Sequence, residues 1–273
     1  MLVILFVVAV IVGVTYSLSF ISYLPQLSIQ RVMVAGAKEM RPELVRAYVE
    51  TKLFGGRRTL LSETNVFLYP RREIERALPE YFPRIRNAKI SRESLFATAL
   101  MISLEEWQPF ARWCSGEPSS TVEESCYVMN ETGFIFAPLT DEHVTAPYVF
   151  RGELSSTTPS SPSTTTFVGR MYLPGHFAGV LAFVERLGQA GFLPREVTAG
   201  SSQDFSVKLE SGFSIRASFG ADIGALVKNL QLVLASESFR GKETQIEYID
   251  LRFGNRVYYK LKGADGQSAF GGE

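Results

Sequence analysis

The side chains that most often bind metals or act in catalysis are scarce in this sequence. It contains two cysteines, Cys114 and Cys126, and two histidines, His143 and His176, among 273 residues. The cysteines lack the C-x-x-C spacing of a zinc site, and two histidines leave little room for a histidine-rich one. No phosphate-binding loop or nucleophile elbow is present. We therefore expect no metal, no cofactor and no small-molecule substrate, and we interpret the chain as a non-enzyme.

An enzyme would have to use these two histidines together with scattered carboxylates such as Asp141, Glu142 and Asp204. His143 sits in a polar loop bounded by proline, and His176 directly follows a Pro-Gly pair. Proline and glycine are typical of turns. Both histidines are therefore expected to be exposed loop residues.

Net charge is also absent, because 28 basic and 28 acidic side chains cancel. Nucleic-acid binding depends on a positive field that attracts phosphate groups. We therefore expect no nucleic-acid partner.

The first thirty residues contain no charged side chain, and residues 2–14 are almost entirely Leu, Val, Ile and Phe. A helix over residues 2–24 would be about 34 Å long, which is enough to cross a hydrocarbon core of about 30 Å. Residues 1–25 are therefore predicted to be a membrane anchor in the lipid bilayer that ends at Pro25. The small residues at 17–19 leave a cleaved signal peptide as the alternative.

The charges beside this segment do not decide its orientation. Arg31 and Lys38 follow it and no basic residue precedes it, so a count of Lys and Arg would keep the large domain inside. Long domains, however, cross the membrane largely regardless of charge. Both orientations remain open on charge alone.

Residues 26–105 have the pattern of a small α+β domain. A strand at 27–34 is followed by a helix that begins at Pro42, a second helix after Pro70 whose end is marked by Pro79 and Pro83, and two strands at 85–91 and 98–104. Strand, helix, helix, strand, strand (βααββ) is the order of a POTRA domain, a small scaffold that presents a sheet edge to other proteins.

Residues 106–263 predict a mixed β-sheet domain with two helices, at 177–187 and 223–234, the second capped by Asp222. Its predicted strands are residues 110–114, 126–129, 134–136, 148–150, 205–209, 213–217, 246–253 and 256–262. Segment 155–166 is nearly all Ser, Thr and Pro, and we predict a flexible loop there. Residues 264–273 are small and polar and are predicted to be a disordered tail. The whole chain is thus expected to be α+β.

Three stretches carry a resemblance to a known family. The first covers 82–85, 88–92 and 100–113, where a strand leads to an acidic residue, a proline, an alanine and an aromatic residue. The second is 127–136, with an acidic residue and a glycine before an apolar pair, and the third is 249–253 with the polar turn and strand after it. In these stretches, and in the order of anchor, POTRA domain and β domain, the chain resembles the FtsQ/DivIB family of bacterial cell division proteins.

The resemblance implies a non-catalytic scaffold with a single membrane span. Its partners would be the bitopic division proteins FtsB and FtsL, or proteins like them, at the division septum. The N-terminus would lie inside the cytoplasmic membrane and the two domains outside. A POTRA-bearing factor for envelope protein assembly or transport is the alternative, although such proteins usually carry several POTRA domains or a barrel.

The expected contact is the last strand, which would expose unpaired N–H and C=O groups to an incoming strand. Arg252 and Phe253 match family positions implicated in the same contact. The predicted partner-binding residues are Arg252, Phe253, Arg256, Val257, Tyr258, Tyr259, Lys260 and Leu261. Alternatively, the apolar members of this strand only cover the core, and its lysines only protect an edge from aggregation.

Cys114 and Cys126 flank a polar loop between two predicted strands. In an oxidising compartment they could form a disulfide that closes this loop. Two unpaired buried thiols are the alternative, and the sequence leaves both open.

Overall fold

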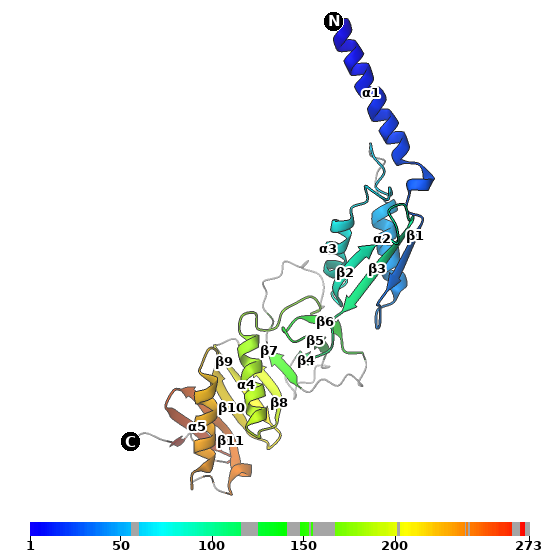
Figure 1. The fold of residues 1–273 in the computed structure, drawn as a ribbon. Coiled ribbons are helices and arrows are strands. Elements are labelled where there is room, and N and C mark those ends of the chain that lie inside the picture. Colours follow the sequence, from blue (N-terminus) through cyan, green and yellow to red (C-terminus); the bar gives the residue numbers. More distant parts are fainter. Residues whose placement is uncertain are drawn as a thin grey trace. The chain divides into compact units, whose positions relative to one another are not determined.

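The computed structural model describes residues 1–55, 60–115, 125–140, 148–152, 154, 167–200, 203–237, 239, 241–263 and 268–270. The chain divides into two compact units, residues 1–107 and residues 108–273. Figure 1 shows the elements of both units in chain order. His143 and the Ser/Thr/Pro segment 155–166 lie outside the described residues.

The first unit begins with α1 (Leu2–Ser22), whose span Val3–Ser22 is long and apolar enough to cross a membrane. The apolar 18-residue window of that span has no buried residue, while Ser22 at its end is buried. At 1.5 Å per residue, 21 residues give a helix of about 32 Å. The chain is therefore compatible with a single-pass membrane protein.

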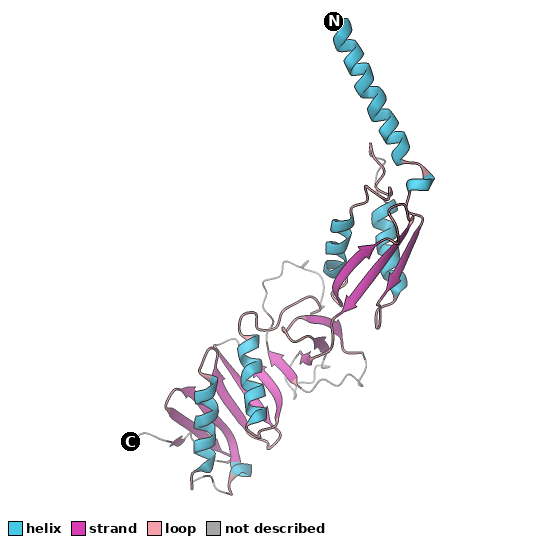
Figure 2. Cartoon of the chain, viewed as in Figure 1, coloured by secondary structure: helices cyan, strands magenta, loops and turns pink. Residues whose placement is uncertain are grey.

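After a short 3-10 turn, η1 (Pro25–Leu27), the first unit forms a three-stranded sheet with two helices, as predicted. The elements are β1 (Arg31–Ala35), α2 (Pro42–Phe54), α3 (Arg71–Tyr81), β2 (Ile85–Ser91) and β3 (Ala99–Glu106). The strand order is β1-β3-β2, with β1 parallel and β2 antiparallel to β3 (Figure 2). The strand that is last in sequence is therefore central in this sheet.

The helices of the first unit pack on the sheet through apolar residues at helical spacing. Val45, Val49 and Leu53 of α2 and Ile74 and Leu78 of α3 are all buried in one cluster. Helix α3 contains Pro79 and ends at Tyr81, between the two prolines that were predicted to mark its end. Leu78 of its last turn is fully buried, and the Leu78 carbonyl accepts a hydrogen bond of 2.9 Å from the Phe82 N–H.

The acidic end of β3 fixes the loop between β1 and α2. The buried Glu106 carboxylate accepts hydrogen bonds from the backbone N–H groups of Lys38, Glu39 and Met40, the shortest at 2.8 Å. The Arg84 guanidinium lies 3.9 Å from the same carboxylate. Glu106 is one of the two acidic residues in the sequence stretch at 100–113, and its role here is to hold the start of α2 against the sheet.

The second unit is a mixed sheet of ten strands with two helices, which agrees with the predicted α+β class. Its strand order is β13-β12-β11-β10-β9-β8-β7-β4-β5-β6. The strands are β4 (Ala111–Cys114), β5 (Cys126–Met129), β6 (Ile135–Pro138), β7 (Val149–Gly152), β8 (Pro194–Ala199), β9 (Asp204–Leu209), β10 (Ser214–Ser218), β11 (Ile246–Phe253), β12 (Arg256–Leu261) and β13 (Ser268–Phe270). The 3-10 turn η2 (Glu243–Gln245) leads into β11.

Helices α4 (Phe177–Gln189) and α5 (Ile223–Ala235) lie on the same face of this sheet (Figure 1). Phe183 and Val184 of α4 and Leu230 of α5 are buried in the same core as the strands. The predicted cap of α5 is confirmed, because the Asp222 carboxylate accepts a hydrogen bond of 3.0 Å from the Ala225 N–H. The opposite face of the sheet carries no described helix.

A disulfide joins Cys114 and Cys126, which lie directly opposite each other on β4 and β5. The turn from β5 to β6 is built by Asn130, whose buried Oδ1 accepts hydrogen bonds from the N–H groups of Thr132 and Phe134. Gly133 follows with φ of 83°, a conformation that favours glycine. The turn within the stretch 127–136 is therefore fixed by Asn130 and Gly133.

Two strands of the second unit were not predicted. β8 pairs with β7 and β9 in the middle of the sheet. β13 lies within residues 264–273, so the prediction of a disordered tail is wrong for residues 268–270. The strand forms there because its backbone groups pair with β12.

Candidate partner-binding edge

The predicted contact strand is part of a hairpin formed by β11 and β12. Gly254 in its turn has φ of 64°, and its carbonyl accepts a hydrogen bond of 3.2 Å from the Asn229 side chain on α5. The strands pair in antiparallel register from Ile246 opposite Leu261 to Phe253 opposite Arg256, with irregularities after Ile246 and after Asp250. Helix α5 therefore fixes the turn, and the two strands are held as one ribbon.

The two faces of β12 differ in what they contact. Val257 is buried, and Tyr259 and Leu261 pack on the core, with the Tyr259 ring 4.5 Å from that of Phe239. On the other face the Tyr258 ring meets that of Phe253 at 5.0 Å, and Lys260 forms an ion pair of 3.0 Å with Glu247. The apolar residues of β12, Val257, Tyr259 and Leu261, therefore cover the core, as the alternative interpretation of this strand stated.

The free edge predicted for β12 is not found. β13 pairs antiparallel with β12, placing Val257 opposite Phe270 and Tyr259 opposite Ser268. With β11 on the other side, residues 257–259 have a strand on both flanks. The sheet therefore ends at β13, and the prediction failed because a segment without apolar alternation can still pair through its backbone.

Arg252, which was predicted as a partner contact, binds two carboxylates within its own chain, and its contact with a partner stays a prediction. Its guanidinium donates to Asp250 at 2.9 and 2.7 Å and to Asp204 at 2.7 Å. Asp250 is fully buried on β11, and Asp204 lies two strands away at the start of β9. Arg252 therefore ties β11 to β9 across the face without helices.

The contacts of Arg252 shift its own pKa and the pKa of Asp204. Hydrogen bonds to Asp250 and then to Asp204 raise the pKa of Arg252 above its already high value. The hydrogen bond from Ser218 and then those from Arg252 lower the pKa of Asp204, against the opposing effect of burial. Both groups are therefore charged at neutral pH.

Phe253 and Arg256 remain the most accessible of the predicted residues. Phe253, the last residue of β11, is 54 % exposed, and Arg256 opposite it is also exposed. The Arg252 guanidinium lies 5.5 Å from the Phe253 ring. An exposed aromatic ring beside a cationic group is typical of interface residues.

Several residues of this surface were missed by sequence reasoning. Arg216 on β10 lies over the Tyr248 ring at 3.7 Å, and Glu247 pairs with Lys260. Asp204 and Asp250 form the acidic side of the Arg252 contacts. Asp250 could have been identified from the sequence, because it is a carboxylate in the middle of an apolar strand and a buried carboxylate must be paired. The other contacts depend on strand order, which the sequence did not provide.

Among the described residues, no group of three or more His, Cys, Asp and Glu side chains is placed to hold a metal ion. His176 is exposed as predicted, and its ring stacks on Phe219 at 4.6 Å.

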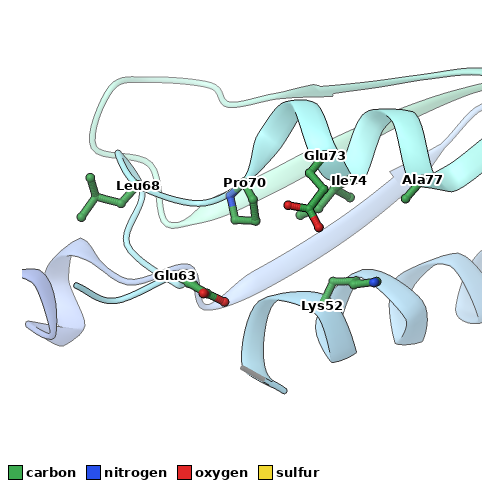
Figure 3. Close-up of a pocket in the computed structure, with 7 residues that line it drawn as sticks. All are labelled: Lys52, Glu63, Leu68, Pro70, Glu73, Ile74 and Ala77. Carbon is green, nitrogen blue, oxygen red and sulfur yellow. The ribbon is translucent and has the colours of Figure 1, made fainter. Parts of the chain in front are cut away.

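A hollow of about 300 Å³ lies beside α2 and α3 (Figure 3). Lys52, Glu63 and Glu73 supply charges of both signs to its lining, beside apolar residues such as Leu68 and Ile74.

Comparison of the chain with models of known protein families and with curated proteins gives no match.

Proposed function

We propose that the protein is a non-catalytic, bitopic scaffold of the bacterial division machinery, similar to FtsQ/DivIB proteins. It would recruit small bitopic proteins like FtsB and FtsL at the septum. The support is the order of an apolar N-terminal helix, a βααββ unit with strand order β1-β3-β2, and a mixed sheet with two helices. In this proposal residues 26–105 are a POTRA domain.

The observation that carries the proposal is the C-terminal end of the ten-stranded sheet. The last three strands lie in the order β11, β12, β13, each further from the middle of the sheet. The outermost strand has three residues, so few backbone hydrogen bonds hold it. A short terminal strand can be exchanged for a longer one that pairs along all of β12.

The proposed contact is therefore strand exchange. An extended partner segment would replace β13 and pair with residues 256–261, and its main-chain hydrogen bonds would supply affinity. Specificity would come from side chains that alternate along the partner strand and meet Tyr258 and Lys260 on one face. Phe253 and Arg256 would contact the partner at the end of the hairpin.

The disulfide supports an outward orientation of the second unit. Disulfides persist in oxidising compartments and are rare in a reducing cytoplasm. A bonded Cys114–Cys126 pair is thus consistent with an N-terminus inside and both units outside the cytoplasmic membrane.

The proposal is tested by co-purification of the full chain with FtsB-like and FtsL-like proteins from the same genome. A variant that ends at Gly263 lacks β13, and its recovery of the partner should rise because the edge of β12 is open. As a matched control of full length, replacing Ser268, Ala269 and Phe270 by Pro removes the N–H donors of β13 and should have the same effect. Lower recovery from both variants would mean that the partner adds to β13 itself, and unchanged recovery would exclude this edge as the contact.

A fluorescent fusion that stays away from the septum would contradict the division role.

A further inference from the structure

Two loops of the first unit expose large apolar side chains close together. They are loop 60–69 between α2 and α3 and loop 92–98 between β2 and β3. Six of their side chains, which we call the membrane-end patch, are 43–69 % exposed: Leu60, Leu61, Phe67, Leu68, Leu95 and Phe96. Single exposed apolar residues are common on proteins, whereas a contiguous group marks a contact surface.

The two loops form one surface. The rings of Phe67 and Phe96 meet edge to face with centroids 5.8 Å apart. Arg92, from the second loop, places its guanidinium 5.7 Å from the Phe67 ring and 5.8 Å from the Tyr69 ring. The patch therefore has an apolar centre with a cationic side chain at its border.

Hydrogen bonds fix this surface to the end of α1. The Ser62 N–H donates to the Ser22 hydroxyl, and the Asn65 amide donates to the Ser22 carbonyl, both at 3.0 Å. The Val66 N–H donates to the Leu27 carbonyl at 2.8 Å. Loop 60–69 is thus joined to the last residue of the helix.

The second loop is held at the same end of the unit. The Thr98 carbonyl accepts a hydrogen bond of 2.8 Å from the Gln30 N–H, eight residues beyond the end of α1. Exposed Arg31 follows directly and starts β1, which pairs with β3 from Ala99. Both loops therefore lie where the chain leaves the apolar helix.

We propose that the membrane-end patch inserts into the interfacial layer of the bilayer that holds α1. If α1 spans a hydrocarbon core of about 30 Å, Ser22 lies at its boundary, and the hydrogen bonds above place Leu61 and Phe67 at that level. Leu and Phe side chains with Arg at the border are the residues that dock protein surfaces into a headgroup layer. The first unit would then rest on the membrane instead of moving freely on a tether. This inference needs α1 in the bilayer and does not depend on the division partners.

The test uses the full chain with one added cysteine, labelled with the polarity-sensitive dye NBD. The two native cysteines are bonded to each other, so only the new thiol reacts. The Phe96→Cys variant carries the label in the patch. The Leu44→Cys variant is the matched control, because Leu44 is an exposed apolar residue at the start of α2, outside both loops. Both are reconstituted in vesicles of phosphatidylcholine and phosphatidylglycerol, with and without lipids that carry a shallow nitroxide quencher.

We expect the label at position 96 to emit at shorter wavelength and to lose most of its intensity with the quencher lipids. The label at position 44 should show neither change. Water-like, unquenched emission at position 96 would overturn the proposal. So would blue-shifted emission that lipid quenchers do not affect and that grows with protein density, because another protein would then cover the patch. Extraction of the chain from vesicles by alkaline carbonate would overturn the anchor and this proposal together, and would leave the strand-exchange contact unaffected.

Discussion

Both units bury a carboxylate on a strand, Glu106 at the end of β3 and Asp250 within β11, and they satisfy it in different ways. In the first unit Glu106 accepts hydrogen bonds from the backbone of Lys38, Glu39 and Met40. In the second unit Asp250 accepts one backbone hydrogen bond, from the Arg252 N–H, and otherwise depends on the Arg252 side chain, which also binds Asp204. Backbone donors are present whatever the residues are, whereas the second arrangement depends on one side chain. The comparison suggests that single substitutions can disrupt the second sheet more than the first.

The two sheets also differ in where their last strand lies. β3, the final strand of the first unit, is between β1 and β2, so it has no edge to offer. The final strands of the second unit follow one another outward to β13. Strand exchange at the C-terminal strand is therefore available to the second unit only.

The largest effect is expected from Arg252→Met in the full chain. The change leaves Asp250 buried without its cationic partner, and removing one partner of a buried pair costs about 3–5 kcal/mol. Hydrogen exchange should show lost protection in the strands of residues 108–273 and normal protection in residues 31–107. Adding Asp250→Asn removes the unpaired charge and should restore part of the stability. If the double variant were as unstable as the single one, the pairing would not be the cause.

A smaller effect is expected from Glu106→Ala, and it should fall on the other unit. Three backbone N–H groups lose their shared charged acceptor, and a hydrogen bond to a charged group contributes about 1.5–3 kcal/mol. Hydrogen exchange should rise in the β1–α2 loop and in α2. The neighbouring Glu105 is 56 % exposed, and Glu105→Ala should change stability by no more than about 0.5 kcal/mol. Equal effects of the two substitutions would contradict the role of Glu106.

The smallest effect concerns acid stability of the first unit. Burial acts to raise the pKa of Glu75, but hydrogen bonds from the Ile90 N–H and Arg71 outweigh it, so its pKa is lowered on folding. A carboxyl with a lowered pKa adds stability above its unfolded pKa of about 4.3, and this stability is lost as the pH falls through the folded pKa. Glu75→Gln should therefore lower stability by less than about 1 kcal/mol at pH 7 and flatten its decline below about pH 4. Urea unfolding at both pH values measures this, and an unchanged acid slope would refute it.

Sequence patterns predicted most elements because their periods are local. The strands Ile85–Ser91 and Cys126–Met129, for example, have the predicted bounds, and Asp222 caps α5 as expected. β8 was not predicted because a proline and two charged residues fill its first half, and only Val197 and Ala199 are buried. β13 was not predicted because its three residues carry no alternating pattern, and they form a strand only by pairing with β12.

The candidate edge was predicted in place but not in detail. The sequence identified the hairpin of residues 246–261 and two of its exposed residues, Phe253 and Arg256. The sequence predicted a partner contact for Arg252 and did not predict its pairing within the chain, because an arginine that is exposed and one that is paired look the same in sequence. The partner that decides the matter, Asp204, lies 48 residues away.

The apolar helix of residues 2–22, the absence of net charge and the βααββ order of the first unit follow from the sequence alone, since each depends on composition or on neighbours a few residues apart. Tertiary structure decided that β13 covers part of β12, that Arg252 joins β9 to β11, and that two loops meet at the end of α1. Those outcomes depend on which distant segments pair, and pairing is set by backbone hydrogen bonds and burial across the whole sheet.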